Sequence, residues 1–319
     1  MRLTIRTALW RSHVASVASS VADLVPVVKG NGYGFGRRWL AETAAEFSDT
    51  IAVGTIHELD GLPDTVTPVV LTPTLSPPLT PTAPSRPPIL TVGNVAHVEA
   101  LAGWTGRVLV KVASSMQRYG QSPEQVGALI ETARSAGLDV VGVSIHPPLA
   151  GTAADHAAEI STRIVDVDPS LPVWVSHLDV ATYRTLPTTH RYRLRLGTAL
   201  WHGDKASLHL GADVLEVRRV SAGERAGYRL GEIETDGHLV IVGAGTAHGL
   251  VAFDSASSDG SGARSPFHFQ RQRLALHESP HMHTSMCVVP DGGPLPQIGD
   301  RVDVQRPLTM TNVDEFEWI

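Results

Sequence analysis

The stretch VPVVKGNGYGFG, residues 25–36, joins a short apolar run to a lysine and four closely spaced glycines. The run is rich in β-branched residues and apolar on both faces, which is typical of a buried parallel strand. A lysine at the end of such a strand, here Lys29, would point into the mouth of a (β/α)8 barrel, where barrel active sites lie. The glycines allow a tight turn beside a ligand. Their spacing fits neither a dinucleotide-binding fingerprint nor a P-loop.

Short apolar runs of this kind recur through the first two thirds of the chain. We expect strands at Leu24–Val28, Ile51–Val53, Val69–Leu71, Ile89–Val92, Val108–Val112, Val140–Ile145, Val173–Val175 and Tyr192–Leu196. Segments that can be helical lie between them. In Ser122–Ala136, for example, Ser122 is placed to cap a helix, Pro123 to begin it and Gly137 to end it. Strands that alternate with helices or loops in this way predict a TIM-type (β/α)8 barrel.

After Gly203 the sequence changes to alternating polar and apolar residues with glycine-rich turns. This pattern is typical of a smaller, mostly β domain. We therefore expect an α/β protein with a (β/α)8 barrel over residues 1–208 and a mostly β C-terminal domain over residues 209–319. A chain of 319 residues with 42% hydrophobic positions is long enough to bury two cores of ordinary size.

Net charge, hydropathy and the scarcity of cysteine and lysine exclude several kinds of partner and site, and they indicate a cellular location. The formal net charge of −6 gives no reason to expect nucleic acid or an acidic membrane as partner. No apolar stretch approaches the ~20 residues of a membrane span, and no secretory signal is visible, so we expect a cytoplasmic protein. Cys287 is the single cysteine, which excludes an intrachain disulfide and a multi-cysteine zinc site. Lysine is scarce as well: only Lys29, Lys111 and Lys205 supply a side-chain primary amine.

The segment VVKGNGYGFG resembles the signature of the alanine racemase family, whose members are fold-type III pyridoxal 5′-phosphate enzymes. In that family the signature lysine holds the cofactor covalently, and a tyrosine four residues later contacts the cofactor phosphate. The resemblance assigns these roles to Lys29 and Tyr33. An amine that holds an aldehyde cofactor is also placed to act as a base at Cα of the substrate.

Further segments extend the resemblance in order along the chain. KVASSMQRYG places Lys111 where many members carry a carbamylated lysine, and Arg118 where an arginine steadies cofactor and substrate. SIHPP and SHLDVAT place His146 and His177 at two histidines of the family's barrel, where we expect them to contact the cofactor. VSAGERAGY resembles a recurrent stretch of the family's β domain.

RLRLGTALWHG resembles the family segment that lies at the pyridine nitrogen and the phosphate of the cofactor. It places Arg195 opposite the pyridine nitrogen, and the backbone of Gly197 and Thr198 at the phosphate. A permanently charged arginine cannot give the ring nitrogen a proton, which weakens the electron sink and suits clean proton exchange at Cα. The alternative is that Arg195 is an ordinary surface arginine at a strand end.

The chain departs from the family where the second catalytic base is expected. Members of the family take this base, a tyrosine in a G-Y-A-D-G motif, from the β domain of the partner subunit. The matching stretch here runs from Gly245 to Gly249 and has Thr246 in place of the tyrosine. A threonine hydroxyl is too weak an acid to replace a phenol. The family's M-D-Q motif begins here at Met282, whose backbone N–H remains available to a substrate carboxylate.

Two histidines in these altered motifs, His248 and His283, are candidates for the missing base. An imidazole titrates near neutrality and can give or take a proton. The alternative is that both are polar, solvent-facing substitutions in a site that has lost racemisation. His281 and His283 would share one face of a strand and could bind a metal ion. No carboxylate lies at metal spacing, so we expect no metal site.

We therefore expect a pyridoxal phosphate-dependent enzyme that acts at Cα of a small amino acid. The simplest form is a racemase or epimerase in which Lys29 serves one face of Cα and His248 or His283 the other. Two alternatives stay open: a one-base enzyme that catalyses elimination, retro-aldol cleavage or decarboxylation, and a non-catalytic protein that binds pyridoxal phosphate. The resemblance also implies a homodimer with an active site shared between subunits.

Overall fold

The computed structural model describes residues 1–78, 86–251 and 264–319. The chain divides into two compact units, one of residues 12–203 and one of residues 1–11 with 204–319. We call them the barrel unit and the β unit and describe each by itself. The domain limits expected from the sequence, 1–208 and 209–319, differ in giving residues 1–11 and 204–208 to the barrel, and they stay a prediction.

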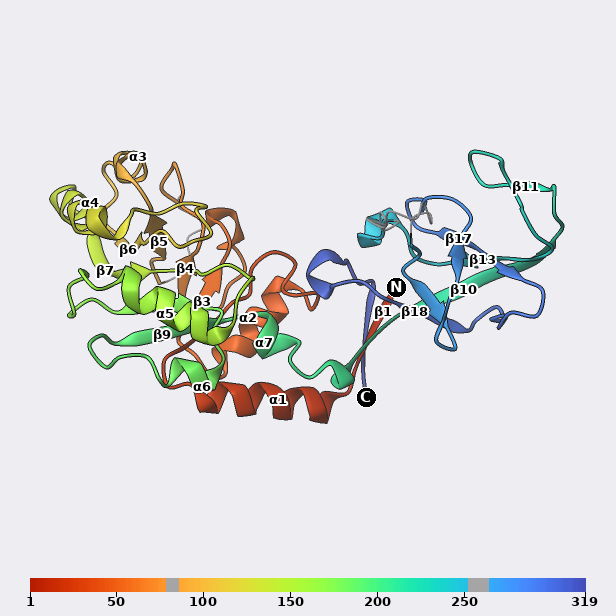
Figure 1. Cartoon of the computed structure of the whole chain (residues 1–319), viewed down its shortest axis with the longest axis horizontal. Helices are drawn as coiled ribbons and strands as arrows, with labels where there is room; N and C mark the ends of the chain where they lie inside the picture. Colours follow the sequence, from red (N-terminus) through yellow and green to blue (C-terminus); the bar gives the residue numbers. More distant parts are fainter. Residues whose placement is uncertain (79–85, 252–263) are drawn as a thin grey trace. The chain divides into compact units, whose positions relative to one another are not determined.

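Eight parallel strands form the barrel unit (Figure 1). In sheet order they are β2 (Leu24–Pro26), β9 (Tyr192–Leu196), β8 (Val173–Ser176), β7 (Asp139–Ser144), β6 (Arg107–Lys111), β5 (Ile89–Val92), β4 (Thr67–Val70) and β3 (Thr50–Val53). A bridge between Val27 and Ala52, with a hydrogen bond of 2.8 Å from Val28 N to Ala52 O, brings the two edge strands together. Each run expected from the sequence overlaps one of these strands, with bounds that differ by up to two residues, and the predicted (β/α)8 barrel is confirmed.

The barrel core explains why the strand segments are apolar on both faces. Every residue of β3, β5 and β8 is buried, although the strands are short. The helices of this unit are α2 (Arg37–Ala45), η1 (Ile56–Glu58), α3 (Val95–Glu99), α4 (Pro123–Ser135), α5 (Ala153–Arg163), α6 (Val180–Tyr183) and α7 (Thr198–Trp201). Helix α4 begins and ends as expected, except that the Ser122 side chain makes no capping hydrogen bond. Helix α1 (Thr7–Ser20) contains the division between the units.

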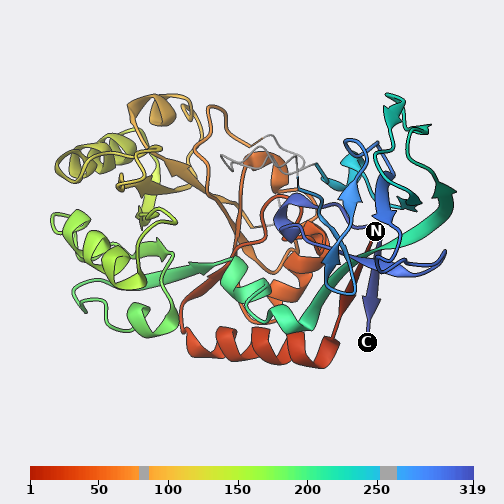
Figure 2. The same cartoon turned by 45° about the vertical axis from the view of Figure 1, so that its right-hand side comes forward.

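The β unit is built around the long strand β10 (Leu208–Val220), the green ribbon beneath the blue strands in Figure 2. Its first half pairs with β1 (Arg2–Ile5) and β18 (Arg301–Val304), and its second half pairs with β13 (Gly237–Val242). An irregularity between Val214 and Glu216 separates the two halves. The remaining elements are η2 (Lys205–Ser207), β11 (Arg225–Ala226), β12 (Gly231–Glu232), η3 (Thr246–His248), β14 (Phe267–Phe269), β15 (Gln272–Arg273), β16 (Ala275–Leu276), β17 (Ser285–Pro290), η4 (Leu308–Met310) and β19 (Glu315–Trp318). The predicted mostly β character of this region is confirmed.

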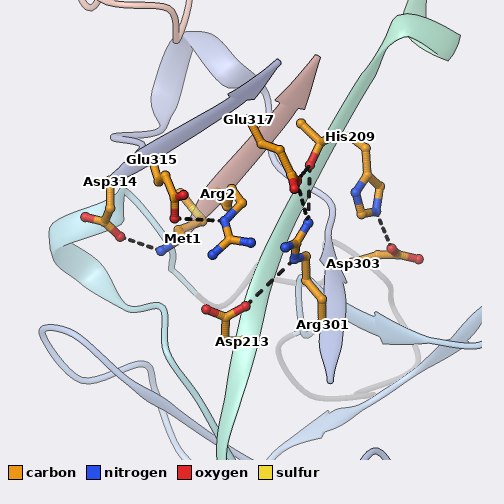
Figure 3. Close-up of polar contacts among 10 residues, drawn as sticks. Met1, Arg2, His209, Asp213, Arg301, Asp303, Asp314, Glu315 and Glu317 are labelled. Carbon is orange, nitrogen blue, oxygen red and sulfur yellow. Dashed lines mark hydrogen bonds and ion pairs between the residues drawn. The ribbon is translucent and has the colours of Figure 1, made fainter. Parts of the chain in front are cut away.

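The two ends of the chain meet in the β unit, where β1 pairs in parallel with β19. Arg2 donates to Glu315 at 2.9 Å across this pair, as Figure 3 shows. Arg301 of the neighbouring strand β18 lies between Glu317, at 3.0 Å, and Asp213, at 3.8 Å. A single exposed ion pair adds little to the free energy of folding. A network of ion pairs across adjacent strands helps to fix the register in which those strands pair.

A stability prediction follows from the β6–β7 pairing, which shifts register next to Gly142. Gly142 has a φ of +154°, and a Cβ there would lie 2.6 Å from the Pro172 carbonyl oxygen. We expect Gly142→Ala to lower the free energy of unfolding by about 2 kcal/mol or more. Gly127→Ala is the control, because its Cβ would meet no atom within 4 Å on helix α4. It should be neutral or stabilise by up to about 1 kcal/mol. Equal urea midpoints for the two variants would contradict the close contact at Gly142 as a cause of lost stability.

Candidate functional site

A pocket rich in positive charge opens at the carboxyl ends of the barrel strands. Its lining residues follow strands β2, β3, β4, β6, β7 and β9, and they are Lys29, Gly54, Leu71, Thr72, Lys111, Arg118, Tyr119, His146 and Arg195. This end of a parallel barrel is where the loops after the strands converge on a ligand. Five of the site residues expected from the sequence therefore share one pocket: Lys29, Lys111, Arg118, His146 and Arg195.

Lys29 stands where the chain leaves β2 and enters the glycine-rich turn. Its carbonyl accepts a hydrogen bond of 3.2 Å from Gly32 N, which starts the turn. Partial burial lowers the pKa of the Lys29 amine, and the positive charges of Arg118 and Arg195 lower it further. Glu58 acts in the opposite direction. A lysine with a lowered pKa has more neutral amine at physiological pH, and the neutral form is the nucleophile and base.

Arg195 is buried at the end of β9 and hydrogen-bonds to neutral oxygen atoms. Its Nη2 donates to the Ile145 carbonyl at 2.6 Å and to Ser176 Oγ at 3.0 Å. Burial lowers the pKa of Arg195 to about 10, so the guanidinium remains charged near neutral pH. An arginine placed this way keeps a positive charge in the pocket without being able to act as a proton donor there.

His146 is held next to Arg195 by the same serine. Its Nδ1 lies 2.5 Å from Ser176 Oγ. Arg195 can only donate, so the serine oxygen accepts from Arg195, while the direction of its hydrogen bond with His146 Nδ1 depends on the histidine tautomer. Burial lowers the pKa of His146 to about 2, and Arg195 contributes to the shift. His146 is therefore a neutral imidazole near physiological pH.

His177 packs its ring against His146, with 4.3 Å between the ring centroids. Its backbone is in the left-handed region, with a φ of +62°, which is uncommon for a residue with a Cβ. Two hydrogen bonds hold it there. His177 Nδ1 lies 3.0 Å from the Pro148 carbonyl, and the His177 carbonyl lies 2.9 Å from Nδ1 of the buried His156 on α5.

Lys111 is the most deeply buried lysine of the site. It ends strand β6 and is only 5% exposed. Burial lowers the pKa of its amine well below the ordinary value, and Arg195 and Arg118 reinforce the shift. At a given pH the neutral amine is therefore more populated at Lys111 than at an ordinary lysine.

Tyr33 and Gly197 form a second, adjoining feature at the start of helix α7. A Cβ on Gly197 would lie 1.9 Å from Tyr33 Oη, so the phenol occupies space that only glycine leaves free. The Tyr33 carbonyl lies 2.7 Å from His202 Nε2, and this hydrogen bond holds the backbone of Tyr33 in place. Burial raises the pKa of Tyr33 to about 12. The neutral phenol and the first N–H groups of α7, beginning near Thr198, suit a phosphate group.

The remaining predicted residues lie together in the β unit. Thr246 N donates to the His281 carbonyl at 2.7 Å, and Ala247 N donates to the Met282 carbonyl at 2.9 Å. The rings of His248 and His283 lie 6.1 Å apart, edge to face.

His248 has contacts that its neighbour His283 lacks in the described part of the chain. It is buried, its Nδ1 accepts from Gly245 N at 3.0 Å, and its Nε2 lies 2.9 Å from Asp314 Oδ2. Both ring nitrogens are thus engaged in holding η3 in place. The His283 side chain is exposed.

Four residues of the site were missed by the sequence analysis: Ser176, His156, Glu58 and Tyr119. Ser176 and His156 act through hydrogen bonds that only the folded chain reveals. Glu58, on η1, accepts from Gly54 N at 2.7 Å and acts electrostatically on Lys29. Tyr119 occupies the variable position of the segment KVASSMQRYG, between Arg118 and Gly120, and an aromatic residue there was the available signal.

Metal-binding clusters and membrane-spanning helices are both absent from the residues that the structure describes. No group of three or more His, Cys, Asp or Glu residues among them is arranged to hold a metal ion. In the same residues, none of the helices has the length and apolar character needed to cross a membrane.

Comparisons with known proteins match the chain to one family and one fold. Residues 8–203 match the family model described as alanine racemase, N-terminal domain. The alanine racemase from Bartonella henselae, solved with covalently bound pyridoxal phosphate, is 20% identical with a TM-score of 0.71, and 99% of each chain is covered. The biosynthetic alanine racemase from Pseudomonas aeruginosa is 20% identical with a TM-score of 0.70, and 100% of each chain is covered. The alanine racemase from Clostridium difficile 630 is 16% identical, with a TM-score of 0.70 over 99% of this chain and 95% of that chain. No curated protein matches the chain.

The electrostatics of the pocket give a test that needs no ligand. Because the charge of Arg118 lowers the pKa of Lys29, Arg118→Gln should raise it toward the ordinary lysine value of about 10.4. Competitive acetylation of the ligand-free protein over a range of pH, read by peptide mass spectrometry, measures the Lys29 midpoint. Arg38→Gln is the control, since this side chain on α2 is 80% exposed. The same midpoint in both variants would show that Arg118 does not act on Lys29.

Proposed function

Since the chain belongs to the alanine racemase N-terminal domain family, we propose that it is a pyridoxal phosphate-dependent enzyme of the racemase type acting on a small amino acid. The observation that carries the proposal is Lys29: an amine of lowered pKa in a cationic pocket at the mouth of the barrel. An aldehyde cofactor needs such an amine, and its phosphate needs positive charge and N–H donors.

The residues present fit pyridoxal phosphate. The neutral phenol of Tyr33, packed so close to Gly197 that a Cβ there would lie 1.9 Å from Tyr33 Oη, and the start of α7 at Thr198 are suited to contact the phosphate. Arg195 would face the pyridine nitrogen, and the neutral ring of His146, packed on His177, would contact the cofactor. The bound cofactor would supply an electron sink for the pair released when a Cα–H bond breaks.

We assign Lys29 the proton transfer on one face of Cα. Its neutral amine takes the Cα proton and returns it, and the charges of Arg118 and Arg195 keep the amine from holding that proton too tightly. Arg118 also suits the substrate carboxylate, because a guanidinium forms paired hydrogen bonds with a carboxylate. The backbone of Met282 is the second carboxylate contact that the sequence suggests. The proposed substrate class is an amino acid with a free carboxylate and a small side chain.

Lys111 is proposed to carry a carbamate. Its pKa is lowered well below the ordinary value, and only a neutral amine reacts with carbon dioxide. The product is an anion, which the neighbouring guanidinium groups of Arg118 and Arg195 would stabilise. The carbamate would in turn hold Arg118 in the orientation that receives a substrate.

The face of Cα opposite Lys29 was assigned from the sequence to His248 or His283. The described contacts of His248 are structural, which leaves its imidazole less free than that of His283. Use of either histidine requires the homodimer with shared sites, which remains part of the proposal, as does a cytoplasmic location. One-base chemistry and non-catalytic cofactor binding remain the alternatives if no group serves the second face.

The first test of the function is cofactor attachment. Lys29→Ala should lose the visible absorbance of the bound cofactor, because no other pocket amine is accessible. Borohydride reduction of the wild-type protein should leave the cofactor on the peptide that contains Lys29. Lys205→Ala is the control, since Lys205 lies in η2 of the β unit, and it should bind cofactor like the wild type. Recovery of the cofactor on Lys111 or Lys205 would refute the assignment.

The carbamate has its own test. Protein equilibrated with carbon-13 bicarbonate should show a carbamate carbon signal by NMR that is missing from Lys111→Met. The amino-acid reaction should slow in buffer stripped of carbon dioxide and recover when bicarbonate returns. A wild-type spectrum with no such signal at any pH where the protein is folded would contradict the proposal for Lys111.

A further inference from the structure

Tyr119 brings a phenol into the pocket of Lys29, and none of the roles assigned above uses it. We propose that Tyr119 is the acid and base on the face of the substrate opposite Lys29, in place of the tyrosine that Thr246 replaces. This inference rests on the proposed racemase function. It places both proton-transfer groups in the barrel unit of a single chain.

Sheet topology puts the two groups on opposite walls. The order of the eight strands is β2-β9-β8-β7-β6-β5-β4-β3, and the Val27–Ala52 bridge joins its two ends. Strand β6 is therefore four strands from β2 in either direction around the barrel. Lys29 follows β2 and Tyr119 follows β6. A ligand held between these walls is approached from opposite sides by the amine and the phenol.

The loop that carries Tyr119 is fixed at both ends. Ala113 N donates to the Gln121 carbonyl at 2.7 Å, and Gln121 N donates to the Lys111 carbonyl at 2.9 Å. Within the loop, Ser114 Oγ donates to the His146 carbonyl at 2.7 Å, which ties the loop to the end of β7. Gly120, next to Tyr119, has a φ of +121°, and a Cβ there would lie 2.8 Å from Ala113 N. The loop thus has a set geometry rather than a variable one.

The phenol ring itself is held by positive charge. The Arg118 guanidinium carbon lies 4.6 Å from the centre of the Tyr119 ring, the geometry of a cation–π contact. The Tyr119 phenol also interacts electrostatically with Arg195. In the described part of the chain, no hydrogen bond to the Tyr119 hydroxyl is found. The oriented ring therefore presents an uncommitted hydroxyl group beside two cations that favour a developing negative charge on oxygen.

The other groups on that side of the pocket suit proton transfer less well. A guanidinium is a poor general acid or base in proteins. Lys111 is almost completely buried, and His146 Nδ1 is already engaged by Ser176 Oγ at 2.5 Å. A phenol can both give and take a proton.

The proposed step conserves atoms and charge. Lys29 Nζ takes the proton from one face of Cα, and the electron pair of the broken C–H bond stays with the substrate and its cofactor. The Tyr119 O–H bond then breaks, and its proton forms a new C–H bond with that pair on the opposite face. Lys29 is left with an extra proton and Tyr119 as phenolate. Exchange with solvent, or turnover of the opposite enantiomer, restores both.

The experiment compares Tyr119→Phe with wild-type holoenzyme, using L- and D-alanine in D2O. Phenylalanine keeps the ring under Arg118 and removes only the hydroxyl. We expect racemisation, measured by chiral chromatography, to fall by about 100-fold or more. Exchange of the Cα hydrogen with retained configuration, measured by proton NMR, should persist for the one enantiomer whose proton faces Lys29. KM and the visible absorbance of the bound cofactor should change little.

Tyr228→Phe is the matched control, because this phenol in the β unit is 85% exposed and should be dispensable. His248→Ala and His283→Ala test the competing candidates from the sequence: loss of racemisation in either, with Tyr119→Phe still active, would assign the second face to that histidine. A second readout does not depend on turnover. L-alanine should slow nitration of Tyr119 by tetranitromethane in the holoenzyme, measured by peptide mass spectrometry, while nitration of Tyr228 is unchanged.

The outcomes separate the inference from the function on which it rests. Racemisation by Tyr119→Phe at the wild-type rate would overturn the inference and leave the function intact. So would an equal loss of racemisation and exchange, or loss of racemisation in His248→Ala or His283→Ala instead. Nitration of Tyr119 that alanine does not slow would also overturn it. Wild-type holoenzyme that neither exchanges nor racemises alanine or other small amino acids would refute the proposed function itself.

Discussion

The chemistry of the barrel mouth depends on a buried guanidinium that hydrogen-bonds to neutral oxygen atoms. Arg195 donates to the Ile145 carbonyl and the Ser176 hydroxyl, and among the described residues that line the pocket none carries a carboxylate. No carboxylate in the described pocket lining offsets its charge, which therefore acts on the neighbouring titratable groups. It contributes to the lowered pKa values of Lys29, Lys111 and His146, although burial is the larger cause for each.

This arrangement accounts for two properties at once. Excess positive charge attracts anions such as a phosphate or a carboxylate, and the same charge adds to burial in lowering the pKa of the two amines and the imidazole. Neutral amines are what an aldehyde cofactor and carbon dioxide react with. With Lys29 and Tyr119 on opposite walls of the pocket, proton transfer on both faces of Cα needs no residue from outside the barrel unit.

Much of the barrel could be predicted from the sequence because its signals are local. Each strand is a short apolar run, and the order of runs specifies a parallel barrel with its loops at one end. Lys29 was found because it directly follows such a run, and Arg195 because the segment around it resembles the family's. The parallel pairing of β1 with β19 joins residues from the two ends of the chain, and no local pattern announces it.

The site residues that escaped prediction act through contacts between distant segments. Ser176 matters because it lies between Arg195 and His146, and its own neighbours in the sequence do not reveal this. His248 was proposed as a base, but the carboxylate that engages it, Asp314, is 66 residues away. Tyr119 was visible as an aromatic residue in a recognised segment. Its position opposite Lys29 depends on the closure of the sheet.

The central claim is that the pocket at the barrel mouth holds pyridoxal phosphate on Lys29. A crystal structure of the protein grown with the cofactor tests this most directly. The account predicts electron density continuous from Lys29 Nζ to the cofactor, the phosphate beside Tyr33 and Gly197, and Arg195 facing the ring nitrogen. Density for the cofactor on another lysine, or a pocket that stays empty at saturating cofactor, would contradict it.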